Sequence, residues 1–164
     1  MRRIVVPVTL LVLALPLAAG AAVRTPGDGT LSVRDLDGYV SVSARGGVIG
    51  RCDRCTLFLN EKVGADEIVP IVSGAKGTDI DFDGAMERWS NIVNGKGELR
   101  WKVIGGNFRM VVRNGSDVDL SVVGKGTAWI FGSKGFYFLN GSTSTQVAPG
   151  PPPVQLPLVS PLGP

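Results

Sequence analysis

Two stretches of the chain decide its fold class: LSVRDLDGYVSVSARGGVIGRCDRCTLFLN (residues 31–60) and MVVRNGSDVDLSVVGKGTAWIFGSKGFYFLN (residues 110–140). With one extra residue near Val118 in the second stretch, strand-like runs align with strand-like runs and turn residues with turn residues. Val33-Arg34 then matches Val112-Arg113. We interpret the stretches as an internal duplication in which each unit has four short strands. The alternative is a chance match, because a chain rich in Gly, Val and Ser matches itself easily.

Runs of β-branched and aromatic residues recur about every nine or ten residues along the chain, and Gly, Asn-Gly or Asp-Gly separates most of them. A convincing helical pattern is absent from the sequence, and the weak candidate is residues 84–93. Two four-stranded units close most simply as a compact antiparallel sandwich or barrel, either of which limits exposed sheet edges. We therefore expect an all-β fold of this kind. A β-solenoid is the alternative, given the regular glycine spacing.

The two ends of the chain differ from this domain in composition. Residues 1–22 place Arg2 and Arg3 before a short apolar run and end on small residues, which is typical of a secretory signal peptide. We expect cleavage and no membrane span afterwards, because the run is shorter than the ~20 residues that a bilayer requires. Residues 147–164 are rich in proline and are predicted to be a disordered tail. Residues 23–146 are then one domain, secreted or held at the cell envelope.

Charge and composition exclude several kinds of chemistry. The formal charge is +3 and falls to +1 once Arg2 and Arg3 are removed with the signal peptide, so net charge gives no support for nucleic-acid binding. The chain has no histidine, which removes the usual general base near neutral pH and the commonest metal ligand. We expect no cofactor.

A hairpin is predicted around Gly105-Gly106. In this register Val103, Trp101 and Leu99 face Phe108, Met110 and Val112 on the core side. The opposite side then carries Arg100, Lys102 and Arg109, a candidate patch for a polysaccharide or an anionic surface. The alternative is an ordinary solvated face of a half-buried sheet, since lysine and arginine also protect sheets from edge aggregation.

Exposed aromatic residues are a second candidate feature. Trp89, Trp129, Tyr39 and Tyr137 are suited to stack on sugars or to form a protein interface. We expect Trp129 in the core, because the run Trp129-Ile130-Phe131 is typical of a strand buried on both sides. Trp89, in the irregular middle of the chain, is the best candidate for exposure.

The run Asp79-Ile80-Asp81-Phe82-Asp83-Gly84 resembles the start of a calcium-binding loop, with Glu87 as a further ligand. Position twelve of such a loop should supply a bidentate glutamate, but it is Ser90 here. The alternation of aspartates with apolar residues is also typical of a strand with one acidic face in water. We favour the acidic strand or loop and predict no metal site.

Cys52 and Cys55 are the two cysteines of the chain and align with Gly132 and Gly135 of the second unit, at a turn between strands. Zinc would require four ligands, and histidine is absent. A redox site would require a helix after the first cysteine, where the flanking residues are strand-like. An exported protein is exposed to oxidising conditions, so we predict a Cys52–Cys55 disulfide across the turn.

Residues 29–51 (GTLSVRDLDGYVSVSARGGVIGR) and 100–126 (RWKVIGGNFRMVVRNGSDVDLSVVGKG) resemble a group of secreted actinobacterial all-β proteins of unknown function. The shared pattern runs through VIGR, IGG-x-FR and DLS-x-VG-x-G. The resemblance implies an exported all-β domain and carries no activity, ligand or catalytic residue. Residues 61–97 and both cysteines lie outside it.

These observations predict a secreted structural or interaction module, with a cell-wall glycan or another envelope protein as partner. The alternative is a carbohydrate- or polyanion-binding module that uses Arg100, Lys102, Arg109 and Trp89. A carboxylate-based hydrolase is the third hypothesis, because paired acids show themselves only in three dimensions. The sequence holds no motif that predicts an enzyme.

Overall fold

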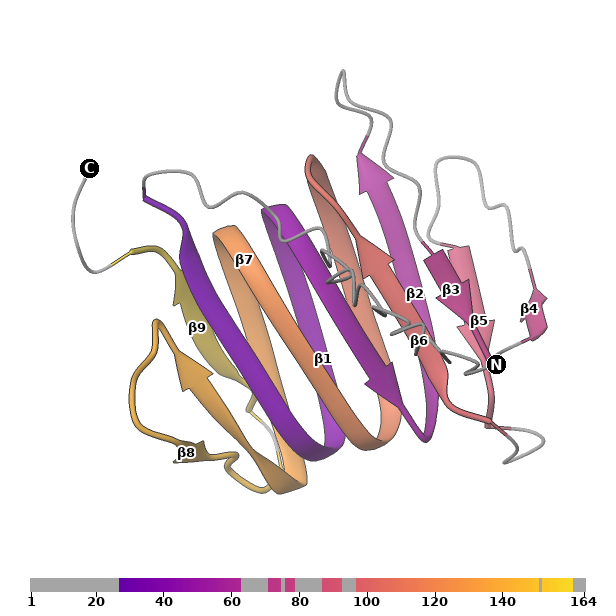
Figure 1. Cartoon of the computed structure of the whole chain (residues 1–164). Helices are drawn as coiled ribbons and strands as arrows, with labels where there is room; N and C mark the ends of the chain where they lie inside the picture. The colour runs from indigo at the N-terminus through magenta and orange to yellow at the C-terminus, as the bar shows by residue number, and fades with distance from the viewer. Residues whose placement is uncertain are drawn as a thin grey trace, which may run out of the picture.

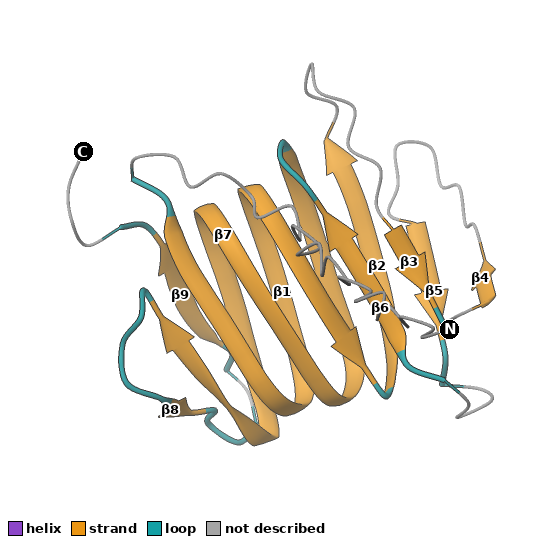
Figure 2. Cartoon of the chain, viewed as in Figure 1, coloured by secondary structure: helices purple, strands orange, loops and turns teal. Residues whose placement is uncertain are grey.

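The computed structural model describes residues 27–62, 71–74, 76–78, 87–92, 97–150 and 152–160. Within these ranges the chain forms nine strands and no helix (Figure 2). The strands are β1 (Gly29–Cys52), β2 (Arg54–Lys62), β3 (Ile71–Ser73), β4 (Lys76–Thr78), β5 (Glu87–Ser90), β6 (Leu99–Val103), β7 (Asn107–Leu139), β8 (Thr145–Gln146) and β9 (Val154–Leu158). The signal-peptide segment 1–22 and the acidic run 79–83 lie outside the described residues.

Two strands are far longer than the rest and wind around each other. β1 has 24 residues and β7 has 33. Leu31 pairs with both Val122 and Leu139, and Val122 pairs with both Leu31 and Val48, so one turn of either strand takes 17 residues. Each strand therefore meets the other on both of its edges. The result is a flattened coil of two antiparallel strands (Figure 1).

The coil forms two layers of antiparallel strands. Layer A contains, in order across the sheet, β3, β6, residues 47–52, 118–123, 29–34 and 136–139, and β8. Layer B contains β4, β5, β2, residues 107–113, 38–45 and 126–131, and β9. Layer A faces the viewer in Figure 1, and layer B lies behind it.

The chain crosses from one layer to the other at bends within continuous strands. Asp35, Asn114 and Asp117 adopt left-handed φ values of 51°, 52° and 53° at such bends. At another bend Gly46 pairs with Gly124, and a Cβ on these residues would lie 2.1 Å and 2.2 Å from a carbonyl oxygen of the opposite strand. Only glycine fits this close approach of the two backbones. The regularly spaced turn residues of the sequence thus mark bends within the long strands, and a straight segment lies between each bend and the next.

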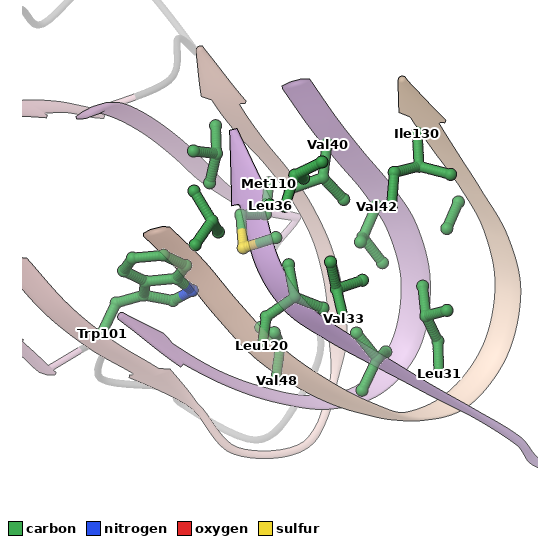
Figure 3. Close-up of a cluster of buried hydrophobic side chains, with 14 of the residues drawn as sticks. Leu31, Val33, Leu36, Val40, Val42, Val48, Trp101, Met110, Leu120 and Ile130 are labelled. Atoms are coloured by element: carbon green, nitrogen blue, oxygen red, sulfur yellow. The ribbon is translucent and has the colours of Figure 1, made fainter. Parts of the chain in front are cut away.

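Inward side chains of both layers form one hydrophobic core (Figure 3). Alternate residues of a strand point to opposite faces, so Val40 and Val42 enter the core while Tyr39 and Ser43 point outward. Leu31, Val33 and Ile130 are at most 1 % exposed. Burying each such side chain contributes roughly 1.5–3 kcal/mol to the stability of the fold. Because the buried residues recur along both long strands, the core stabilises the coil over its length.

The predicted all-β architecture, a compact antiparallel sandwich or barrel, is confirmed, because the antiparallel sheet is nearly closed. The two sequence units correspond to β1 with β2, and to β7, and each passes through four straight segments. The aligned residues Val33 and Val112 are both buried, and the aligned bends at Asp35 and Asn114 are both left-handed. The units are nevertheless not separate meanders. Consecutive segments of one unit lie in opposite layers and pair with the other unit.

The expected hairpin across Gly105-Gly106 is wrong. β6 pairs with Val48–Cys52 of β1 in layer A, whereas β7 begins in layer B. The connection crosses the rim of the coil, where the Gly46 N–H donates a hydrogen bond to the Gly106 carbonyl oxygen at 2.9 Å. The inward and outward assignment of these strands still holds, because Trp101 and Met110 are both buried.

The proline-rich segment 147–164 is not disordered throughout. β9 pairs with Gly126–Ile130 of β7, and Val147, Leu156 and Leu158 are buried. Pro157 lies in this outermost strand of layer B, where a missing N–H is tolerated. The alternation Val-Gln-Leu-Pro-Leu therefore outweighs the high proline content.

Candidate functional site

A groove runs over the outer face of layer B, across three neighbouring segments. Its floor is formed by Ser41 and Ser43 of β1, and its sides by residues from the two adjoining parts of β7. The described lining residues are Tyr39, Ser41, Ser43, Ala44, Arg45, Asn107, Phe108, Arg109, Lys125, Trp129, Phe131 and Pro153. The small serine side chains leave space between bulkier neighbours, which makes the surface concave.

One end of the groove is aromatic. Tyr39 and Phe131 are cross-strand partners, and their rings stack with centroids 5.0 Å apart and planes inclined by 21°. Trp129 lies two residues from Phe131 on the same face and keeps 40 % of its surface exposed. These flat apolar surfaces suit the C–H face of a sugar ring.

The other end of the groove is cationic. Arg45, Arg109 and Lys125 are exposed and line it together. None of them forms an ion pair with another described residue. The described residues that line the groove include no Asp or Glu. Among the described residues, no acidic side chain forms an ion pair with these three cations.

The strand sequence explains this placement directly. In the run Tyr39-Val40-Ser41-Val42-Ser43-Ala44-Arg45 the apolar members are buried, so every other residue faces the groove. The same alternation in β7 buries Ala128 and Ile130 and turns Trp129 outward. Beside the groove, Phe58 lies under the guanidinium groups of Arg113 and Arg88, at 5.2 Å and 5.9 Å from the ring centroid.

The outer face of layer A carries a different charge cluster, centred on Arg51. Its Nε and Nη2 donate to Asp119 Oδ2 at 3.0 Å and 2.6 Å, and its Nη1 donates to Glu98 Oε1 at 3.1 Å. Asp117 lies 3.5 Å from Nη2. The hydrogen bonds from Arg51 to Asp119 and to Glu98 hold the pKa of Arg51 above its ordinary value.

The pKa values of the carboxylates in this cluster are shifted in different directions. Burial raises the pKa of Asp119, but the Asp35 N–H and the Arg51 guanidinium outweigh it and hold the pKa below its ordinary value. The pKa of Glu98 is lowered, chiefly by its hydrogen bond from Arg100. Burial raises the pKa of Asp117, against the attraction of Arg51. We interpret the cluster as an ion-pair network that holds a bend of the coil.

The structure separates the predicted cationic patch. Arg100 and Lys102 lie on the outer face of layer A, whereas Arg109 lies on layer B. The separation follows from the missing hairpin. On layer B Arg109 shares the groove with Arg45 and Lys125, two cations that the expected hairpin did not include. Arg45 could have been predicted as outward-facing from the sequence, because apolar and polar residues alternate through Val40 and Val42.

The aromatic predictions are reversed for two tryptophans. Trp89, expected to be exposed, is partly buried against the core, because it pairs with the inward-facing Leu57. Trp129, expected in the core, is 40 % exposed, because its neighbours Ala128 and Ile130 point into the core and it points to the opposite face of layer B. Tyr39 lines the groove, while Tyr137 packs against the core.

The predicted disulfide between Cys52 and Cys55 is confirmed, with Cα atoms 6.1 Å apart. Both cysteines are buried, and Asn91 fixes the turn between them. Its Oδ1 accepts from the Cys55 N–H at 2.7 Å, and its Nδ2 donates to the Asp53 and Gly97 carbonyl oxygens, both at 2.8 Å. The disulfide is therefore a structural clip at a bend.

Of the weak calcium candidates, Asp79, Asp81 and Asp83 lie outside the described residues, and Glu87 begins β5. The described part of the chain contains no group of three or more side chains suited to hold a metal ion. None of its residues belongs to a helix long and apolar enough to cross a membrane. Comparison with known protein families, curated proteins and solved structures finds no match to this chain.

Proposed function

We propose that the protein is a non-catalytic binding module for acidic glycans, and that the groove on layer B is its binding site. The observation that carries the proposal is a floor of serines between three cations, which form no ion pair with a described residue, and three aromatic rings, of which Trp129 is exposed and Tyr39 and Phe131 are half-buried. The predicted signal peptide supports an envelope or extracellular location, where the ligand is a cell-wall polysaccharide.

The groove offers the two kinds of contact that an acidic sugar polymer needs. Arginine forms paired, charge-assisted hydrogen bonds to oxyanions such as carboxylate and phosphate. Aromatic rings cover the apolar face of a sugar at little cost in side-chain entropy. Ser41 and Ser43 add hydroxyl groups that exchange hydrogen bonds with sugar hydroxyls.

Hydrolysis is not favoured at this site. Glycoside hydrolysis needs a pair of carboxyl groups beside the bound sugar. The described lining of the groove supplies none, and the acids around Arg51 lie on the other layer. Binding without turnover is the activity that these side chains support.

Titration calorimetry tests the proposal with three ligands of equal length: a hexamer of a polyuronic acid, a neutral β-linked glucose hexamer and a single-stranded hexanucleotide. We expect the uronic acid hexamer to bind most tightly and its affinity to fall as salt rises. Equal or tighter binding of the hexanucleotide would replace the glycan by nucleic acid, because stacking on aromatic rings between cations also suits single strands. Absence of binding to all three would refute the proposal.

A further inference from the structure

We infer that the groove on layer B holds its ligand in one orientation, with an anionic group at the end that contains Arg45 and an uncharged sugar ring at the end that contains Tyr39. The inference rests on the proposed function, because it specifies the ligand of the same groove. It follows from the register of the strands, which sorts the lining side chains by chemistry.

Outward side chains of layer B lie in rows across neighbouring strands. The first row contains Tyr39 and Phe131, and the second contains Ser41 and Trp129. The third row contains Arg109, Ser43 and Thr127, and the fourth contains Asn107, Arg45 and Lys125. The chemistry therefore changes along the strands, from aromatic rings in the first two rows to cations in the last two.

The length of the groove sets the size of the ligand. A strand rises about 3.3 Å per residue, so the six steps from Tyr39 to Arg45 span about 20 Å. From Trp129 to Lys125 the span is about 13 Å. A single sugar ring is too short to reach both ends. An oligosaccharide is the smallest ligand that uses the aromatic and the cationic ends together.

Electrostatics favours charge at one end of that oligosaccharide. The faces of aromatic rings carry negative partial charge, so an anionic group placed over Tyr39, Phe131 or Trp129 is disfavoured. A wholly neutral ligand would offer no charged partner to Arg45, Arg109 and Lys125, and the described lining of the groove has no Asp or Glu. The best match is a chain with uncharged rings at the aromatic end and an oxyanion at the other end.

A β-linked glucose tetrasaccharide provides the probe, because its reducing-end ring can be oxidised to an aldonic acid that adds one carboxylate. We expect the oxidised form to bind about tenfold more tightly than the unmodified form, as a charged hydrogen-bonded contact allows. The double variant R45Q/K125Q should remove this difference. W129A should weaken both forms by the same factor. A tetrasaccharide 1-phosphate, titrated in parallel, shows whether the cationic end prefers phosphate to carboxylate.

Orientation is read by NMR with a nitroxide attached to the non-reducing end of the oxidised tetrasaccharide. The label should broaden the amide signals of Tyr39 and Phe131 and spare those of Arg45 and Lys125. Equal broadening at both ends, or broadening only at Arg45, would overturn the inference. If a uronic acid hexamer binds while the oxidised tetrasaccharide binds no better than the neutral one, the orientation fails and the proposed function stands. If no glycan binds, both fail.

Discussion

The outer faces of the two layers carry cations in opposite settings. On layer A, Arg51 contacts Asp117, Asp119 and Glu98, and Arg100 pairs with Glu98. On layer B, Arg45, Arg109 and Lys125 line a groove whose described residues include no acid. The same two strands build both faces, with the same alternation of inward and outward residues.

This difference shows that the role of a cation depends on its neighbours across the strands. An arginine that is surrounded by carboxylates contributes to folding and has little free capacity to bind an anion. An arginine without a partner contributes little to stability and is available to a ligand. The small net charge of the chain therefore conceals a carboxylate cluster around Arg51 on layer A and a groove without described acids on layer B.

The largest effect is expected from removing the three groove cations. The variant R45Q/R109Q/K125Q should bind an acidic hexasaccharide about 100-fold more weakly, from roughly 1 kcal/mol for each lost charge-assisted contact. Calorimetry at fixed salt measures the loss. The control R34Q/R100Q/K102Q on layer A removes the same formal charge and should change the affinity less than about threefold. Equal losses in the two variants would mean that net charge alone drives binding.

A single aromatic side chain should have the next largest effect on affinity. W129A should weaken glycan binding about tenfold, since a stacked ring contributes about 1 kcal/mol beyond its buried area. Phe136 on layer A is a matched control, because it is 43 % exposed and Trp129 is 40 % exposed. F136A should leave the affinity unchanged. A comparable loss of affinity in F136A would mean that the glycan does not bind specifically to layer B.

The stability of the fold should depend on the layer A cluster more than on the groove cations of layer B. D119N should lower the free energy of unfolding by roughly 1–2 kcal/mol, because Asp119 accepts from the Asp35 N–H and twice from Arg51. R45Q should change it by less than about 0.5 kcal/mol, since Arg45 is exposed and forms no ion pair with another described residue. Urea unfolding measures both. A larger loss in R45Q than in D119N would contradict the distinction between the faces.

The smallest effect concerns the dependence of stability on pH. The pKa of Asp119 is lower in the folded protein than in the unfolded chain, so its contribution is complete above the unfolded pKa and is lost as pH falls through the folded one. Glu98 acts in the same direction. Asp117 has a raised pKa, so its contribution is present at low pH and is lost as pH rises. Unfolding midpoints measured below about pH 5 should therefore fall less steeply in D119N than in the unaltered protein. An unchanged slope would show that Arg51 does not hold Asp119 ionised.

Local alternation in the sequence was sufficient to predict the all-β fold and most inward-facing residues, and the position of two cysteines at one turn was sufficient to predict the disulfide. Val40, Val42 and Val122 follow the period of two that a half-buried strand imposes. Cys52 and Cys55 are close in sequence, so their pairing required no knowledge of the tertiary structure. The interleaving of β1 with β7 could not be predicted in this way. Gly and Asp mark both hairpin turns and bends, and the choice between them depends on pairing between distant segments.

The candidate site was predicted only in part for the same reason. Arg109 was selected correctly as outward-facing, but its partners were inferred from a hairpin that does not form. Trp129 was assigned to the core from its apolar neighbours, yet it points to the outer face of layer B while Ala128 and Ile130 point inward. The groove joins residues 39–45 with residues 107–109 and 125–131, and this juxtaposition exists only after the two strands have coiled.

If the layer B groove is the binding face, the ligand should contact its residues and leave layer A free. NMR titration of the 15N-labelled protein with an acidic hexasaccharide tests it most directly, because amide shifts locate contacts residue by residue. We predict that the largest shifts fall on residues 39–45, 107–109 and 125–131, while residues 47–51 and 118–121 of layer A stay unchanged. Shifts centred on layer A, or no shifts at a saturating ligand concentration, would contradict the account.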